Sequence, residues 1–473
     1  MSVWQLTMMG LGTVVGGSFF LGLTIALNAT GPSLILSYLI GGAIIYVILF
    51  ALSEMTVADP NSGSFRTYAK RAFGSGAGFV VGWVYWTGLI LAMSSEAIAV
   101  SILMKSWFPN ISIGLLGSGI IIAVTLLNLL GAELLSKLES GLAVIKLLAI
   151  VGFIVLGLAL VVGMFPGNPQ VGVQELAAEP IFLGGVSGIA GSMLMVMFTY
   201  AGFEIIGLAS SETKNPKKTV PQAIKFSVFG LISLYTGAVA VLLLLIPSSQ
   251  IPASVSPFVA ALTRHGLGWA ANSINFVLVS AILSTMLAAT FGLGRMIRSL
   301  ADEGFAPSLI KGKGNVPYRG ILFSGGAMLA ALVFGLLLPA NVYTFLVSSG
   351  GFALLFTYAV IVASHLRLRK LNGCPGDGKC QLPAYPYTSW FALTSLIIVI
   401  GSMPLVTGQG TGLVAGLLLL ALYSLAFFIV NSRKKVVVAV RGTQQKSVNI
   451  NKLRLKYGME ASKEHLHRKD EEK

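Results

Sequence analysis

Long apolar stretches alternate with short polar stretches along most of the chain. A helix needs about 20 apolar residues to cross a hydrocarbon core of roughly 30 Å. We expect the stretches that approach this length to be transmembrane helices, and together they predict an all-α polytopic membrane protein with about twelve spans. The spans are expected near residues 4–27, 32–55, 79–104, 114–131, 141–164, 187–209, 222–246, 272–299, 320–338, 341–365, 389–407 and 411–431.

The composition agrees with this class. Of 473 residues, 55% are hydrophobic and only 10% are charged, whereas about 25% are charged in soluble domains. The net charge of +15 comes from basic residues between the apolar stretches, so it indicates topology and not a nucleic-acid-binding surface. With both termini in the cytoplasm, the outer loops carry only Lys105 and Arg264, and the positive-inside rule therefore predicts this orientation in the plasma membrane.

The chain changes character after the last span. Residues 1–431 form the predicted transmembrane domain, and residues 432–473 are polar and charged, so we expect a disordered cytoplasmic tail. Cys374 and Cys380 fall in a cytoplasmic loop, where we expect no lasting disulfide, and their spacing does not match a zinc site. No metal or cofactor is expected.

Small residues are concentrated in the first span, which reads GLGTVVGGSFFLG from residue 10 to residue 22. Such residues allow helices to pack closely. They also suit an unwound break, whose free N–H and C=O groups line a cavity and bind a polar substrate. The residues of this stretch alone leave both interpretations open.

A second interruption lies in the sixth span, where Thr199, Tyr200, Gly202 and Glu204 interrupt an apolar run. A carboxylate at membrane depth costs roughly 2.5–3.5 kcal/mol on insertion scales, which marks a functional-site candidate. Spans one and six correspond if spans one to five and six to ten form two repeats. Repeats of five spans enter the membrane from opposite sides, so the pattern predicts inverted repeats and a secondary transporter.

The interrupted spans resemble motifs of the amino acid transporter branch of the amino acid-polyamine-organocation superfamily. GTVVGGSFFLG is similar to its first-span motif, and FTYAGFEIIGLASSETKNPKKTVPQAI is similar to its sixth-span signature. LSEMTVADPNSGSFRTYAKRAFG, GWVYWTGLILAMSSEAIAV and RMIRSLADEGFAP agree with the same branch. The resemblance implies a LeuT-like fold with broken helices 1 and 6, repeats at about 4–164 and 187–365, extra helices at about 389–431, and amino acid transport by alternating access.

The first break is expected to bind the substrate carboxylate. Backbone N–H groups of Gly16, Gly17 and Ser18, at the start of a half-helix, would donate to it. Many relatives read Gly-Ser-Gly or Gly-x-Gly where this chain reads Gly16-Gly17-Ser18. This difference leaves open which residue donates and whether the Ser18 hydroxyl takes part.

The resemblance assigns the substrate ammonium to backbone carbonyls of Val14, Phe198 and Ala201, with Glu204 as a further contact. The Phe198 ring corresponds to an aromatic lid that excludes water from the bound substrate. Ordinary packing is the other interpretation of this phenylalanine.

Lys146 is the charged residue of span five, close to its cytoplasmic end. Snorkelling of its ammonium to the interface is one interpretation. In proton-coupled relatives a lysine here stands where sodium-coupled members hold an ion, so we predict proton symport with Lys146 as the leading coupling residue and Glu204 as the second. Ser284 in span eight keeps sodium coupling as an alternative.

Three further charged residues are interpreted as supporting groups. Glu96 lies at membrane depth in span three and is expected to be structural. Glu54 and Arg66 lie near the cytoplasmic ends of their segments, where an ion pair that closes a gate is one of several pairings.

These features favour import of a neutral amino acid by proton-coupled symport, and they leave cationic amino acids and γ-aminobutyrate open as substrates. An exchanger and a sodium symporter remain alternatives, and a receptor that binds an amino acid without moving it is the alternative from another class. No enzyme is expected, because the chain contains neither H-E-x-x-H nor G-x-S-x-G. The expected partners are the amino acid, protons and the lipid bilayer, with no nucleic acid.

Overall fold

The computed structural model describes residues 2–59, 64–165, 176, 179–204, 206, 213, 215–252, 255–312, 314, 316–337, 342–374 and 380–431. The predicted tail at 432–473 lies outside the described residues. The chain divides into two units, Met1–Leu420 and Ala421–Lys473, and the described part of the second unit is helical.

The described residues form helices and turns without a strand, and a helix lies within every predicted span. Nine helices of this part of the chain are long and apolar enough to cross a membrane, the last of them at Gln409–Asn431, and α7 and α10 are shorter apolar helices. The helices are α1 (Val3–Val14), α2 (Gly17–Phe20), α3 (Gly22–Thr30), α4 (Leu34–Ala58), α5 (Ser64–Phe73), α6 (Ser75–Met104), α7 (Ile113–Asn128), α8 (Ala132–Val161), α10 (Gly185–Thr199), α12 (Pro216–Leu245), α13 (Pro257–Arg264), α14 (Gly268–Asp302), α15 (Tyr318–Leu337), α16 (Val342–Asn372) and α17 (Tyr387–Ser402).

The first span is broken between α1 and α2. Helix α1 ends at Val14, and Val15 and Gly16 are extended before α2 begins at Gly17. A Cβ atom on Gly12 would lie 2.6 Å from the Cβ of Ala143 in α8, so this glycine allows close helix packing. The stretch therefore combines a break in the helix with a position of close helix packing. Substrate binding at the break stays a prediction.

The sixth span is interrupted after α10 ends at Thr199. Gly202 has a φ of +110°, a backbone conformation that favours glycine. A Cβ atom on Gly202 would lie 3.1 Å from the carbonyl oxygen of Thr13 in α1. The interruption of the sixth span therefore lies directly against the end of α1.

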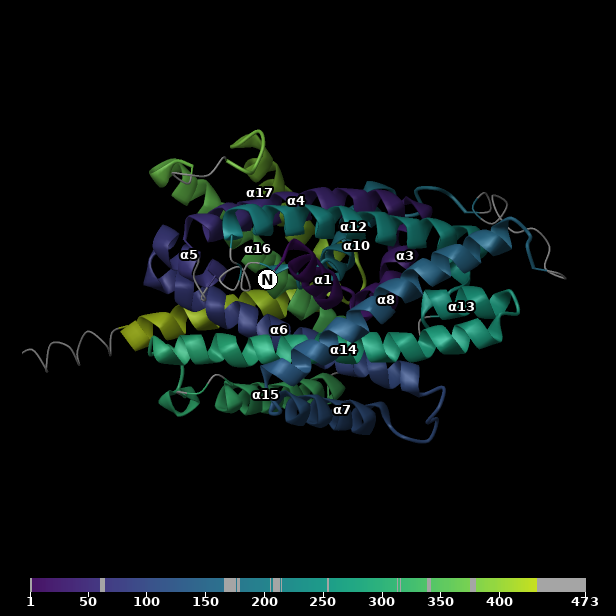
Figure 1. Cartoon of the computed structure of the whole chain (residues 1–473), viewed down its shortest axis with the longest axis horizontal. Coiled ribbons are helices and arrows are strands. Elements are labelled where there is room, and N and C mark those ends of the chain that lie inside the picture. The colour runs from purple at the N-terminus through teal and green to yellow at the C-terminus, as the bar shows by residue number, and fades with distance from the viewer. Residues whose placement is uncertain are drawn as a thin grey trace, which may run out of the picture. The chain divides into compact units, whose positions relative to one another are not determined.

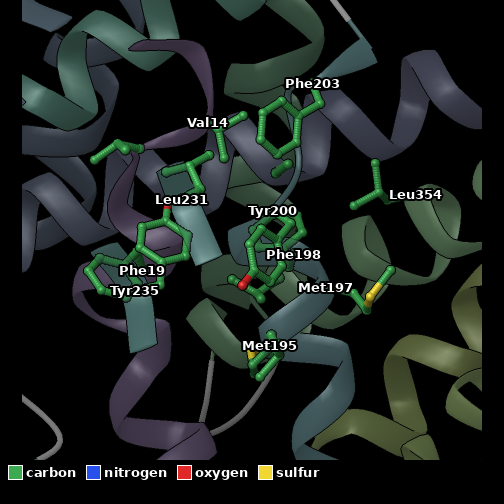
Figure 2. Packing of buried hydrophobic residues seen from close by; sticks show 14 of the residues in the cluster. Val14, Phe19, Met195, Met197, Phe198, Tyr200, Phe203, Leu231, Tyr235 and Leu354 are labelled. Atoms are coloured by element: carbon green, nitrogen blue, oxygen red, sulfur yellow. The ribbon is translucent and has the colours of Figure 1, made fainter. Parts of the chain in front are cut away.

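Helix α1 packs against α8, α12 and α14 (Figure 1). Figure 2 shows buried side chains next to the breaks, which come from the first span, from α10 and the residues after it, from α12 and, with Leu354, from α16. The rings of Phe19 and Tyr235 stack with their centroids 3.9 Å apart. The ring of Tyr200, at the second break, also lies 5.5 Å from that of Tyr235, so both breaks adjoin one buried aromatic cluster.

The cysteine prediction is wrong for this structure, because Cys374 and Cys380 are joined by a disulfide. Their Cα atoms lie 5.5 Å apart, within the usual range for a disulfide.

Candidate functional site

The first break presents two backbone donors to a buried carboxylate. Glu96 of α6 is 4% exposed, and its Oε2 and Oε1 accept hydrogen bonds from the N–H groups of Gly17 at 2.9 Å and Ser18 at 3.1 Å. Gly16 lies beside them, since a Cβ there would be 3.6 Å from Glu96 Oε1. The donors expected to bind a substrate carboxylate thus hold a carboxylate of the protein itself.

A lysine lies on the carbonyl side of the same break. Lys146 of α8 is 1% exposed, and its ammonium donates to the Gly12 carbonyl at 2.7 Å and to Thr285 Oγ1 of α14 at 3.1 Å. The Thr285 hydroxyl also lies 3.1 Å from the Val15 carbonyl oxygen. The ammonium therefore points into the protein, and the snorkelling interpretation is wrong.

Thr285 was missed in the sequence, where the neighbouring Ser284 was singled out. Successive helix residues point about 100° apart, so only one of the two can face Lys146. The Ser284 hydroxyl is buried and lacks a hydrogen-bond partner within the described part of the chain.

The carboxylate at the second break connects three spans. Glu204 is 4% exposed and accepts hydrogen bonds from the hydroxyl groups of Tyr85 in α6 at 3.0 Å and Tyr358 in α16 at 3.2 Å. The Gly202 N–H donates to the same carboxylate at 3.1 Å. Both tyrosines were missed, although the need of a buried carboxylate for donors was a signal that partners exist.

The carbonyls predicted to receive the substrate ammonium lie at the two breaks. Val14 is buried at the end of α1, Phe198 is 5% exposed near the end of α10, and Ala201 follows that helix. The Phe198 carbonyl accepts the Ala201 N–H at 3.1 Å, so it is already used within a turn. The contact between Gly202 and Thr13 brings the two sets of carbonyls towards each other.

The suggested pairing of Glu54 with Arg66 is wrong, because each has other partners. Glu54 accepts from His365 at 2.7 Å, while Arg66 donates to Glu303 at 2.5 Å and to Ser299. Burial raises the pKa of Glu303, but hydrogen bonds and charge from Arg66 and Lys70 outweigh this and leave the pKa below its ordinary value. These clusters lie outside the two breaks.

Within the described residues there is no group of three or more His, Cys, Asp or Glu residues that could hold a metal ion. The polar groups around the breaks are instead backbone N–H and C=O groups, hydroxyl groups and single charged side chains. Such an arrangement suits a small zwitterion, because its two charged ends need donors and acceptors at separate places.

A family model described as amino acid permease matches residues 5–441. An uncharacterized amino acid permease of Bacillus subtilis (strain 168), YtnA, is 33% identical and covers 89% of this chain and 93% of its own. A γ-aminobutyric acid permease of the same strain is 30% identical (88% and 91% covered), and an aromatic amino acid transport protein of Corynebacterium glutamicum is 30% identical (86% and 88% covered).

A solved structure shares the fold at lower sequence identity. The crystal structure of a manganese transporter variant from Eremococcus coleocola has a TM-score of 0.54 and 16% identity, and the match covers 91% of this chain and 96% of the other. Together with the family match, this likeness confirms the predicted LeuT-like fold.

Proposed function

Because this chain belongs to the amino acid permease family and is a transporter of amino acids, we propose that it imports a neutral amino acid into the cell by proton-coupled symport. The plasma membrane and cytoplasmic termini belong to the same proposal, and the basic residues between the spans support them.

The observation that carries the proposal is the placement of Lys146. Its ammonium bridges the Gly12 carbonyl of the broken span and Thr285 of α14. Charge-assisted hydrogen bonds of this kind are roughly twice as strong as neutral ones. Release of one proton would weaken the bridge, and uptake of one proton would restore it, so the protonation of Lys146 is coupled to the attachment of α1.

Glu204 is the second proton-coupling candidate. Its hydrogen bonds to Tyr85 and Tyr358 connect the second break to α6 and α16. A change in its charge would alter both bonds at once. This placement supports a coupling or gating role more directly than a contact with substrate.

The substrate would lie between the breaks. Its carboxylate would take N–H groups of Gly16, Gly17 and Ser18, and its ammonium would take the carbonyls of Val14, Phe198 and Ala201, under the Phe198 ring. Lys146 and Glu204 already bond protein groups, which favours a substrate with a neutral side chain. Relatives named γ-aminobutyric acid permease make that compound the first ω-amino acid to include in a substrate panel.

The experiment is uptake of labelled amino acids into proteoliposomes under an imposed inward proton gradient, and then under a sodium gradient. We expect accumulation with protons that an uncoupler abolishes. Exchange without accumulation would contradict symport, and binding without counterflow would indicate a receptor.

The matched variants are Lys146→Ala and, as a control, Lys225→Ala, which removes an exposed lysine of α12. We expect Lys146→Ala to lose accumulation and its pH dependence, and Lys225→Ala to keep both. An unchanged accumulation ratio in Lys146→Ala would remove the lysine from the coupling step.

A further inference from the structure

The carboxylate of Glu96 occupies the donors that the proposed function gives to the substrate. Each of its two oxygens takes one backbone N–H, from Gly17 and from Ser18. Resting on the proposed function, we infer that Glu96 is an internal ligand of the carboxylate subsite, which the substrate carboxylate must displace in order to bind.

The Glu96 carboxylate and a substrate carboxylate cannot bind the Gly17 and Ser18 N–H groups at the same time. Each backbone N–H has a single hydrogen, and both are directed at Glu96 oxygens within 3.1 Å. A Cβ on Gly17 would collide with Glu96 Oε2 and would lie 2.9 Å from Ile282 Cδ1. A second carboxylate therefore reaches these donors only after the Glu96 side chain has moved away.

The pairing satisfies both partners in this conformation. Glu96 is 4% exposed, and an ionised carboxylate at this depth requires hydrogen bonds to offset its desolvation. The extended backbone before α2 leaves the Gly17 and Ser18 N–H groups without helical acceptors, and such groups need a partner when buried. Glu96 thus keeps the broken backbone bonded when no substrate is bound.

Charged and titratable groups on three other helices face this carboxylate. Lys146 of α8, Tyr235 of α12 and Tyr343 of α16 all interact with Glu96 electrostatically. Once the Glu96 side chain has left the Gly17 and Ser18 N–H groups, the positive charges of Lys146 and the substrate ammonium can stabilise its carboxylate. The exchange of one carboxylate for another leaves the number of hydrogen bonds at the break unchanged.

The consequence concerns selectivity and release. When an internal group occupies a site, the apparent Kd of a ligand equals its intrinsic Kd divided by the fraction of protein in which the site is free. An amino acid carboxylate can replace Glu96, whereas an amine without a carboxylate has nothing to offer the two N–H groups. Glu96 therefore selects for substrates with a carboxylate and also returns to expel them.

The test measures binding to the purified full-length protein in lipid nanodiscs with two ligands. These are an amino acid that the wild type transports and the corresponding amine that lacks the carboxylate. The variants are Glu96→Gln and the control Ser95→Ala, whose hydroxyl bonds the Ala92 carbonyl within its own helix. Glutamine has one acceptor oxygen and no charge, so it is a weaker occupant of the break.

We expect Glu96→Gln to bind the amino acid about tenfold more tightly and the amine no more tightly, because the lost bonds are charge-assisted. Ser95→Ala should match the wild type with both ligands. Weaker binding of both ligands to Glu96→Gln would mean that Glu96 holds the substrate ammonium, and unchanged binding would mean that nothing is displaced; either result overturns the inference.

If Glu96→Gln does not fold, Glu96→Asp keeps the charge but shortens the reach by one methylene, and tighter binding of the amino acid is again expected. The same binding as the wild type, or weaker binding, would overturn the inference. Wild-type uptake in proteoliposomes tests the proposed function separately: its absence contradicts transport, whereas normal uptake with a wrong result for Glu96 contradicts only the displacement.

Discussion

Replacement of Glu54 by glutamine should destabilise the protein strongly. Glu54 is 4% exposed at the C-terminal end of α4, and its carboxylate bonds His365 at 2.7 Å and Arg369 at 3.2 Å on α16. The backbone N–H groups of Gln381 and Leu382 donate to the same carboxylate at 2.5 Å and 2.7 Å. Four donor groups from two segments thus converge on one side chain.

The size of the destabilisation follows from the hydrogen bonds that a glutamine side chain cannot accept. Glu54→Gln leaves one acceptor oxygen and directs an amide NH2 group at donors, so at least one buried donor loses its partner, at about 1–3 kcal/mol. Arg369 loses its charged partner as well, and removal of one member of a buried ion pair costs about 3–5 kcal/mol. We expect the free energy of unfolding to fall by about 3–5 kcal/mol.

The assay is the apparent melting temperature in detergent, measured by size-exclusion chromatography after heating. Asp302→Asn is the control, because Asp302 is 55% exposed in its pair with Arg298 and such pairs contribute about 0–1 kcal/mol. Glu54→Gln should melt several degrees below this control. Equal melting temperatures would refute the reasoning that buried donors need the Glu54 charge.

Three further predictions follow from local contacts. The folded pKa of Glu303 lies below its ordinary value of 4.5, so its contribution to stability is present above pH 4.5 and is lost as the pH falls through the lower folded value. The melting temperatures of the wild type and Glu303→Gln should therefore converge in acid. A difference that widens as the pH falls would contradict this sign. Gly12→Ala should lower the free energy of unfolding by about 1–3 kcal/mol, because the new Cβ would collide with α8. Gly119→Ala is the control: its Cβ would meet open space, so it should be neutral or stabilising by up to about 1 kcal/mol. Equal effects of the two variants in thermal melts would contradict the packing argument. Tyr85→Phe and Tyr358→Phe should each lower the free energy of unfolding by about 1–3 kcal/mol. In the double variant the two effects should not add, because both hydroxyl groups donate to the Glu204 carboxylate. Strict additivity would show that the two tyrosines act separately.

Sequence reasoning located the spans and both breaks because these depend on local composition. Apolar length defines a membrane helix, and small residues or a carboxylate inside one are visible without knowledge of its neighbours. The residues alone left open whether Lys146 is buried and whether the first span is broken after Val14, and the structure shows both. The family match and the shared fold agree with the architecture inferred from it.

The partners of the charged groups could not be predicted, because they depend on the rotation and tilt of each helix. A rotation of one residue separates Thr285, which contacts Lys146, from Ser284, which does not bond it. Glu54 and Arg66 lie near each other in the sequence but pair with different helices. Glu96 was interpreted as structural, and nothing in its own span indicates that it reaches the N–H groups of another broken helix.

The contact of Gly202 with the Thr13 carbonyl has a mechanical consequence. The interrupted sixth span meets the last turn of α1 here, with no side chain on Gly202 to separate them. A tilt of one half-helix therefore changes the room available to the other, and the two breaks act as a single joint. Motion that begins at either break is therefore expected to reach the other through this contact.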